Sequence, residues 1–424
     1  MITSKLHELY LKSNGVSTDT RKITKNSIFF SLKGKNFDGN EYALEALNNG
    51  AKYAVIDNKN LNNPNFIKVN NVLESLQKLS LFHRTKLINT IFIAITGSNG
   101  KTTTKELVHS VLSQKYKTKS THGNLNNHIG VPLTLLNIKE DTDFAVVEMG
   151  ANHIGEIKFL TNLIKPDLGY ITNFGKAHLE GFGGFEGVIK GKSELYDWLL
   201  ENKKPILINT NDKIQSDYIN SKSITFGLNN NSKYIFKKDD SENFVLLNYN
   251  NIKIKSNLIG DYNLNNIGAA VSLGLHFKLD IKSIKKAIQN YTPNNNRSQL
   301  LNIKDKKIIL DAYNANPTSM QLAIESFIKL SGKKILILGD MFELGLYTKE
   351  EHLKLIKQLE KINIKTYFVG KEFYKLKKQS NMFSFFKTKK DVTTKISKNR
   401  IREKNILIKG SRGMKMETIL DYIK

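Results

Sequence analysis

The sequence predicts an α/β protein of three domains, and three observations support this prediction. The chain has 424 residues, which is enough for two or three hydrophobic cores. Short apolar runs alternate with segments of helical periodicity, a pattern typical of parallel sheets covered by helices. One apolar run is followed by a glycine turn and a helix, the order found in phosphate-binding loops. We therefore expect a small α/β domain over residues 1–88, a central P-loop ATPase-like parallel-sheet domain over 89–296 and a C-terminal Rossmann-like domain over 297–424.

The first domain is predicted from strand and helix patterns of ordinary length. Its expected elements are strands over residues 28–32 and 53–56, a helix over 42–49, and a second helix whose apolar face contains Val72, Leu73, Leu76, Leu79 and Phe82. Two polar segments, residues 17–21 and 33–39, have the composition of turns. Taken alone, these segments are interpreted as turns rather than as binding loops.

The central domain begins with the clearest signal in the chain. Residues 91–95 predict a buried strand, Gly97 and Gly100 end it, and helical periodicity follows. Glycine backbone N–H groups and a helix N-terminus favour phosphate, Lys101 adds a cation, and a threonine hydroxyl can hold magnesium. The full Walker pattern requires glycine where Ile95 stands, so this shortened loop fits common kinases and GTPases poorly. A glycine turn with a solvated lysine is the alternative interpretation.

Two further strands are predicted for the same sheet, over residues 144–148 and 170–173. Glu148 ends the first strand, where P-loop folds place a second acid directed at magnesium. A helix-capping or solvated carboxylate is the alternative interpretation of Glu148. His178 follows the second strand, and a lone histidine there is more typical of a turn or cap than of a ligand. The other expected elements are helices over 187–200 and 260–276, with short strands and polar turns over 201–255.

The last domain repeats the alternation of strand and helix patterns. The predicted strands are residues 308–310, 335–338, 366–369 and 406–408. Asn316 is expected to cap a helix whose first residue is Pro317, which is the favoured order. No Gly-x-Gly-x-x-Gly follows a strand, so the sequence does not predict a dinucleotide site.

Composition argues against several classes of protein. The chain has no cysteine, which excludes a disulfide scaffold and thiolate metal sites and suits a reducing cytoplasm. No run approaches about 18 apolar residues and the N-terminus lacks an apolar export segment, so no membrane partner is expected. The net charge of +26 would attract a nucleotide or another anionic substrate. The lysines are dispersed, and even residues 371–390 lack a recognisable nucleic-acid motif, so no nucleic-acid partner is expected.

Taken together, the motifs resemble the Mur ligase family along nearly the whole chain. The segments that carry this resemblance are the shortened ATP loop at 95–103, a magnesium-binding strand end at 148–151, a histidine loop at 172–179 and a lysine helix at 192–194. Within the family, residues 124–132, 311–317 and 339–345 are similar to the member that adds D-alanyl-D-alanine. These motifs are long and occur in the family's order, so chance agreement is remote.

The resemblance implies an ATP-dependent, ADP-forming ligase of peptidoglycan precursor synthesis. Its substrates would be UDP-N-acetylmuramoyl tripeptide and D-alanyl-D-alanine, with Mg²⁺ as cofactor. The tripeptide carboxylate would attack the γ-phosphate, and the dipeptide amine would then capture the acyl phosphate. We expect a monomer in which the third domain rotates onto the second during the reaction.

The resemblance also implies roles for individual residues. ATP would be bound by Gly97, Ser98, Asn99, Gly100, Lys101, Thr102, Thr103, Asn263, Asn266, Arg297 and Asp311. The metal ligands would be Thr102, Glu148 and His178, and the catalytic residues Lys101, His178 and Lys192. The substrate-binding residues would be Thr20, Arg21, Asp38, Asn126 and Asn127. Lys192 would be carbamoylated, whereas the sequence alone predicts a solvated helix residue. Tyr262 stands where many relatives have histidine, so the resemblance assigns it no role.

Two other functions share part of this pattern. A folylpolyglutamate synthase-like amide ligase uses the same ATP loop and carboxylate activation, but normally lacks a comparable first domain and the segment 340–345. A basic P-loop ATPase that binds nucleic acid would use the same loop, with only the charge in its favour. Assays of ATP hydrolysis with each set of substrates would distinguish the three.

Overall fold

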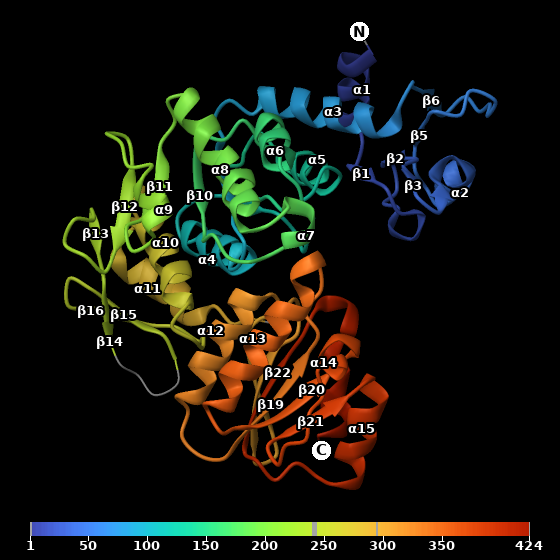
Figure 1. Cartoon of the computed structure of the whole chain (residues 1–424). Coiled ribbons are helices and arrows are strands. Elements are labelled where there is room, and N and C mark those ends of the chain that lie inside the picture. The colour runs from blue at the N-terminus through green and yellow to red at the C-terminus, as the bar shows by residue number, and fades with distance from the viewer. Residues whose placement is uncertain (1, 240–243, 294–295, 424) are drawn as a thin grey trace.

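The computed structural model describes residues 2–239, 244–293 and 296–423. Three α/β bodies follow one another along the chain, each with its own largely parallel sheet. Figure 1 shows the N-terminal body in blue and the C-terminal body in orange to red, on different sides of the central body. The predicted α/β class with three domains is confirmed. The boundaries at 88/89 and 296/297 fall between the sheets and remain our proposed limits.

The N-terminal domain contains a four-stranded parallel sheet in the order β1-β2-β5-β6. Its elements are α1 (Ile2–Leu11), β1 (Val16–Ser17), η1 (Thr20–Lys22), β2 (Ile28–Phe30), β3 (Lys33–Gly34), β4 (Phe37–Asp38), η2 (Gly39–Tyr42), α2 (Ala43–Asn48), β5 (Tyr53–Ile56), β6 (Phe66–Lys68) and α3 (Val72–Lys86). The buried face of α3 contains Val72, Leu76 and Leu79, whereas the predicted Leu73 and Phe82 are only half-buried. Val72, Leu76 and Leu79 follow the i, i+4, i+7 spacing of one helical stripe. Leu73 and Phe82 lie beside this stripe and are therefore less buried.

The central domain has a seven-stranded parallel sheet in the order β13-β12-β11-β10-β7-β9-β8. Its strands are β7 (Ile91–Thr96), β8 (Thr118–Ser120), β9 (Phe144–Glu148), β10 (Leu168–Ile171), β11 (Ile206–Asn209), β12 (Ile224–Gly227) and β13 (Tyr234–Ile235). Its helices are α4 (Lys101–Leu112), α5 (Gly130–Leu135), α6 (Glu156–Ile164), α7 (Leu179–Phe182), α8 (Phe185–Glu201), α9 (Lys213–Ser216), α10 (Asn263–His276) and α11 (Ile281–Asn290). A small antiparallel sheet adds β14 (Lys237–Asp239), β15 (Leu246–Tyr249) and β16 (Ile252–Lys255).

The strand order of the central sheet decides where its polar residues meet. Strand β7 lies between β9 and β10, with Ile95 opposite Glu148 and Thr96 opposite Ile171. The carboxyl ends of these three strands therefore share one edge of the sheet, where open α/β sheets bind their ligands. Strand β10 ends at Ile171, two residues before its predicted end, and the Thr172 side chain donates a hydrogen bond to Asn99 O in the loop after β7.

The C-terminal domain has a six-stranded sheet in the order β17-β18-β22-β19-β20-β21, parallel except for the edge strand β17. Its strands are β17 (Gln299–Ile303), β18 (Lys306–Asp311), β19 (Lys334–Gly339), β20 (Lys365–Val369), β21 (Phe383–Phe386) and β22 (Asn405–Lys409). Its helices are α12 (Pro317–Ile328), η3 (Gly345–Tyr347), α13 (Thr348–Glu360), α14 (Lys371–Lys375), α15 (Lys389–Lys398), η4 (Arg412–Met414) and η5 (Met416–Tyr422). The predicted cap is confirmed, since Asn316 accepts a hydrogen bond from Ser319 N and Pro317 is the first residue of α12.

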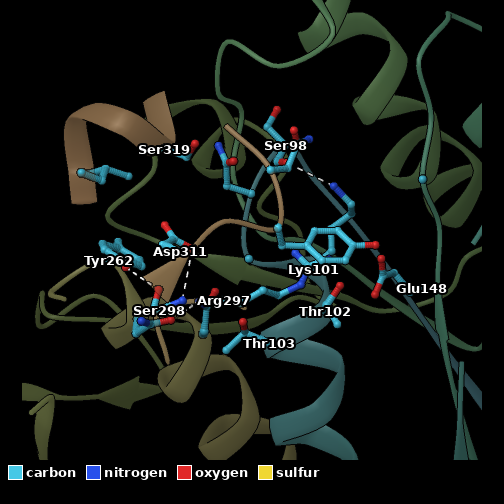
Figure 2. Close-up of a pocket in the computed structure, with 18 of the residues that line it drawn as sticks. Ser98, Lys101, Thr102, Thr103, Glu148, Tyr262, Arg297, Ser298, Asp311 and Ser319 are labelled. Carbon is cyan, nitrogen blue, oxygen red and sulfur yellow. Dashed lines mark hydrogen bonds between the residues drawn. The ribbon is translucent and has the colours of Figure 1, made fainter. Parts of the chain in front are cut away.

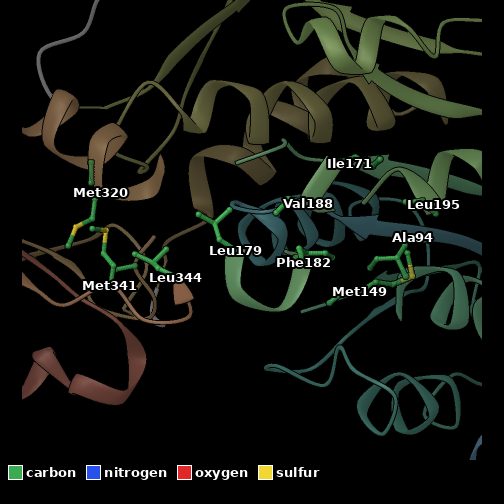
Figure 3. Close-up of a cluster of buried hydrophobic side chains, with 14 of the residues drawn as sticks. Ala94, Met149, Ile171, Leu179, Phe182, Val188, Leu195, Met320, Met341 and Leu344 are labelled. Atoms are coloured by element: carbon green, nitrogen blue, oxygen red, sulfur yellow. The ribbon is translucent and has the colours of Figure 1, made fainter. Parts of the chain in front are cut away.

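One apolar cluster joins the central and C-terminal domains. Figure 3 shows Leu179 and Phe182 of α7 between the central core and Met341 and Leu344 of the C-terminal domain. All four side chains are buried, and burial of apolar surface stabilises the contact between the domains.

Among the described residues, no helix has both the length and the apolar character needed to cross a membrane.

Candidate active site

The loop between β7 and α4 has a backbone that requires glycine at two positions. Gly97 has φ +134° and Gly100 has φ +81°, both in the region that favours glycine. A Cβ at Gly97 would lie 2.0 Å from Thr172 Oγ1, and a Cβ at Gly100 would lie 2.6 Å from Asn266 Oδ1. The loop therefore packs tightly and leads directly into the N-terminus of α4, the arrangement that favours a bound phosphate.

Lys101 is the first residue of α4 and its ammonium is held over the loop. Its Nζ donates hydrogen bonds to Gly97 O over 2.7 Å and to Ser98 O over 3.1 Å. Burial lowers the pKa of Lys101 to about 8, against the opposing effect of the Glu148 carboxylate. The side chain is therefore mostly protonated at pH 7 and presents a cation where the loop would hold phosphate.

Glu148 is the last residue of β9 and lies next to the phosphate loop. It is the strand-end acid that the sequence predicts. Its Oε1 accepts a hydrogen bond from Asn126 Nδ2 over 2.7 Å. Its Oε2 is buried, and no described residue donates a hydrogen bond to it. A buried carboxylate oxygen without a donor is suited to a hard cation, and Thr102 in the first turn of α4 lines the same cavity.

The described residues do not form a complete cage for a metal ion. No group of three or more His, Asp or Glu side chains is gathered tightly enough among them. Mg²⁺ usually keeps several waters and binds one or two carboxylates together with substrate phosphates. Glu148 and Thr102 therefore fit magnesium bound with a nucleotide.

His178 lies at the boundary with the C-terminal domain. It adopts a left-handed conformation with φ 54° immediately before α7. Its Nδ1 lies 2.6 Å from Glu343 Oε2, and this imidazole lowers the pKa of Glu343. Glu343 also has a left-handed backbone, with φ 62°, and its carbonyl accepts a hydrogen bond from Glu180 N. The histidine loop therefore docks on the C-terminal segment 339–345.

Lys192 is buried on the inner face of α8, so the expectation of a solvated residue from sequence alone is wrong. The residue is 1% exposed, its Nζ donates to Ala151 O over 3.0 Å, and its ammonium lies 4.9 Å from the Phe182 ring centroid. Burial lowers the pKa of Lys192 well below its ordinary value. The sequence alone missed this burial because it does not show which face of α8 turns inward.

Two asparagines of α10 form the wall beside the phosphate loop. Asn266 Oδ1 accepts a hydrogen bond from Thr104 Oγ1 over 3.0 Å, and Asn266 Nδ2 donates to Asn263 Oδ1 over 2.8 Å. Tyr262, whose role was open, forms a hydrogen bond of 2.6 Å with Ser298 Oγ in the C-terminal domain. Tyr262 therefore connects the two domains at the rim of the cavity.

The C-terminal domain supplies the opposite wall. Arg297 stacks on the ring of Tyr313 at 3.6 Å, and Asp311 accepts hydrogen bonds from Ser298 N and from Lys409 Nζ, over 3.1 and 2.5 Å. Figure 2 shows Arg297, Ser298 and Asp311 facing Lys101, Thr102 and Glu148. The cavity that these walls enclose measures about 250 Å³.

Most of the predicted site residues line this one cavity. Those that line it are Ser98, Asn99, Gly100, Lys101, Thr102, Thr103, Asn126, Glu148, His178, Asn263, Asn266, Arg297 and Asp311. Gly97 shapes the loop, Lys192 reaches Ala151 behind the lining, and Asn127 accepts hydrogen bonds from the N-terminus of α5 instead. The roles of these residues remain predictions.

Three predicted substrate residues lie in the N-terminal domain and do not line the cavity. The Arg21 side chain donates to Asp19 within its own turn, and Thr20 O accepts a hydrogen bond from Asn49. Asp38 caps η2 by accepting a hydrogen bond from Asn40 N. Their assignment to the UDP-linked substrate remains a prediction.

Lys409 is a cavity residue that sequence reasoning did not select. It is 1% exposed and donates to both Asp311 and Asn314 O. Its position directly after the predicted strand 406–408 and before Gly410 was the available signal. The spacing of apolar residues in a strand does not show whether a lysine at its end is buried.

Comparison with known proteins gives matches along the whole chain. The family descriptions "Mur ligase family, catalytic domain", "Mur ligase middle domain" and "Mur ligase, glutamate ligase domain" match residues 12–84, 95–274 and 296–412. The UDP-N-acetylmuramoyl-tripeptide--D-alanyl-D-alanine ligase of Bacillus subtilis is 34% identical, over 96% of this chain and 92% of its own. The enzyme of the same name from Escherichia coli is 31% identical, over 96% and 93%.

Solved structures of MurF enzymes also match the chain over nearly its whole length. MurF from Acinetobacter baumannii superposes with a TM-score of 0.87 at 27% identity, covering 98% of this chain and 97% of that one. MurF from Thermotoga maritima in complex with ADP gives a TM-score of 0.84 at 26% identity, covering 98% of each chain.

Proposed function

Because the chain belongs to the Mur ligase family, we propose that it joins D-alanyl-D-alanine to UDP-N-acetylmuramoyl tripeptide. It is an ATP-dependent, ADP-forming ligase of peptidoglycan precursor synthesis. One observation carries this proposal: the phosphate loop and the Arg297–Asp311 wall, which lie in different domains, line one cavity. The full-length relatives that bear this enzyme's name supply the identity of the two substrates.

The first chemical step must overcome repulsion between anions. The tripeptide carboxylate attacks the γ-phosphorus, an oxygen–phosphorus bond forms, and the bond to ADP breaks. Two like unit charges about 4 Å apart repel by about 4 kcal/mol at an effective dielectric near 20, and the triphosphate carries several. Lys101 lowers this barrier because its ammonium faces the developing phosphate charge. A magnesium ion held at Glu148 and Thr102 would supply further positive charge.

The second step forms the amide bond. The dipeptide amine attacks the acyl carbon, the carbon–oxygen bond to phosphate breaks, and the amine loses a proton. An α-amino group with a pKa of about 7.8 is roughly one-seventh neutral at pH 7, so no strong protein base is required. The cavity walls from two domains exclude water, which protects the acyl phosphate from hydrolysis.

Lys192 supports a further part of the proposal, a carbamate formed with carbon dioxide. Burial lowers the pKa of this amine, which favours its neutral, nucleophilic form. The neutral amine attacks carbon dioxide, the nitrogen–carbon bond forms as one proton leaves, and the neutral amine becomes a carbamate anion. Together with His178, this anion would favour a second magnesium ion.

The remaining assignments concern binding and location. Thr20, Arg21 and Asp38 would bind the UDP-linked substrate from the first domain, and Asn126 and Asn127 would also be substrate-binding residues. The protein would act as a cytoplasmic monomer, because ATP and UDP-linked precursors are cytoplasmic and the cavity is completed within one chain.

A ligation assay tests the function. Purified protein is incubated with ATP, Mg²⁺, D-alanyl-D-alanine and the UDP-muramoyl tripeptide that contains either diaminopimelate or lysine, and pentapeptide and phosphate are measured. Pentapeptide in equal amount to phosphate is the expected result. Phosphate release that requires folate plus glutamate, or nucleic acid, would contradict the proposal.

A further inference from the structure

The phosphate loop contacts the C-terminal domain directly through two asparagine side chains. Asn316 Nδ2 donates a hydrogen bond to Asn99 Oδ1 over 2.8 Å, and Asn99 Nδ2 donates to Asn316 Oδ1 over 3.4 Å. Asn99 precedes Gly100 in the loop, and Asn316 is the N-cap of α12. This pair of amides is a link between the two halves of the cavity.

The conformation of the loop determines where the Asn99 side chain points. Asn99 N donates to Asn173 Oδ1 over 3.1 Å, and Asn99 O accepts from Thr172 Oγ1 over 2.6 Å and from Asn173 Nδ2 over 2.9 Å. The backbone of Asn99 is therefore fixed on both sides of its side chain. This conformation of the loop directs the Asn99 amide toward Asn316.

The position of Asn316 is in turn coupled to the nucleotide-facing wall. It is 6% exposed, and a four-residue segment separates it from Asp311. Tyr313, within that segment, stacks under Arg297, and Lys409 fixes both Asp311 and Asn314 O. A displacement of Asn316 would therefore move Arg297 and Asp311.

We propose that Asn99 and Asn316 are positioning residues that align the phosphate loop with the Arg297–Asp311 wall. This inference rests on the proposed ATP-dependent function. The buried apolar cluster keeps the two domains together, whereas the directional amide pair sets their register at the nucleotide. Loss of one such neutral pair corresponds to about three- to tenfold weaker binding.

A double-mutant cycle tests the pair. Asn316→Ser keeps an accepting oxygen for Ser319 N, since serine is a favoured N-cap, but is too short to reach Asn99. Asn99→Ala removes the partner, and the two changes are then combined. The measurements are the affinity for a non-hydrolysable ATP analogue and the thermal midpoint. Asn316→Thr replaces Asn316→Ser should the serine variant fold poorly.

The control is Thr388→Ala, which removes a capping-box residue of α15 in the same domain. We expect Asn316→Ser to weaken analogue binding about three- to tenfold, and Asn99→Ala to add little in that background. Thr388→Ala should lower the thermal midpoint and leave the affinity unchanged. Additive losses in the double variant, or unchanged affinity in Asn316→Ser, would overturn the proposal. A wild-type protein that does not bind the analogue would instead refute the proposed function.

Discussion

The ATP-facing cavity and the N-terminal domain place their site residues in opposite ways. In the cavity, Glu148 and Asp311 are held by contacts with Asn126 and Lys409 on other elements, whereas Lys101 is held by the carbonyls of its own loop. In the N-terminal domain, Arg21 contacts Asp19 of its own turn, and its side chain is 85% exposed. The difference teaches that the cavity is built from contacts between distant segments, whereas the proposed UDP-substrate residue Arg21 is held only within its own exposed turn.

The largest effect should follow removal of the loop cation. We expect Lys101→Ala to lower ligase turnover by about 10³-fold, because no other described lysine contacts the carbonyls of this loop. The thermal midpoint should change little, since the side chain serves a ligand loop. Pentapeptide formation measures the turnover, and a melting curve measures the thermal midpoint. Turnover like that of the wild type would remove the loop from the mechanism.

Lys192→Ala should be nearly inactive, with a loss of about 10²-fold or more. If the residue acts as a carbamate, acetate or formate should partly restore turnover by supplying an anion in the vacated space. The matched control is Lys190→Ala, which lies on the exposed face of the same helix and should remain active. Mass measurement that finds unmodified Lys192 in an active, magnesium-loaded enzyme would refute the carbamate.

The pH dependence of nucleotide binding separates charge from shape in the cavity. Since the pKa of Lys101 is lowered to about 8, the free enzyme loses this cation above that pH, and affinity for an ATP analogue should fall about fivefold from pH 8 to pH 9. Between about pH 8 and 10.5, the lysine is still protonated in the unfolded chain but neutral in the native state. The cost of burying its charge therefore disappears, and the free energy of unfolding rises with pH in this range. Weaker binding in this range would therefore not result from unfolding through Lys101. The affinity of Lys101→Arg for the ATP analogue should not fall between pH 8 and pH 9, because arginine stays protonated.

The N-terminal region should show a smaller and more selective effect. We expect Arg21→Ala to raise KM for the UDP-linked substrate about tenfold and to leave KM for ATP unchanged. Stability should hardly change, because exposed ion pairs contribute little. Lys22→Ala, in the same turn, is the control. Equal effects of the two variants, or a raised KM for ATP, would contradict a specific role for Arg21.

The sequence predicted the cavity better than the N-terminal surface for a physical reason. Gly97, Gly100 and Lys101 must stand in one order for a loop to hold phosphate, so their spacing carries the geometry. Glu148 was found because the end of a buried strand can be read from its apolar residues. Turns such as residues 17–21 have no comparable constraint, and only the family resemblance suggested their role.

Contacts between distant segments could not be predicted from spacing. Lys192 was expected to be solvated because a lysine on a helix usually is, although α8 turns it inward. Lys409 meets Asp311 on the neighbouring strand of the C-terminal sheet, and the Asn99–Asn316 pair depends on how the C-terminal domain docks. Each of these polar groups is defined by a partner more than 40 residues away.

The smallest expected effect concerns the docking of the C-terminal domain itself. Lys176 donates to Glu351 over 2.6 Å and Lys176 N donates to Thr318 Oγ1, which adds polar contacts to the apolar cluster between the domains. ATP would bridge the loop and the Arg297–Asp311 wall, so bound ligand should stabilise this docked arrangement. We expect residues 297–424 to move relative to the centre in the free protein, and the radius of gyration from small-angle scattering to fall when ATP analogue and UDP-substrate bind. Identical profiles in both states, from enzyme verified to be saturated and active, would show that the cavity is preformed.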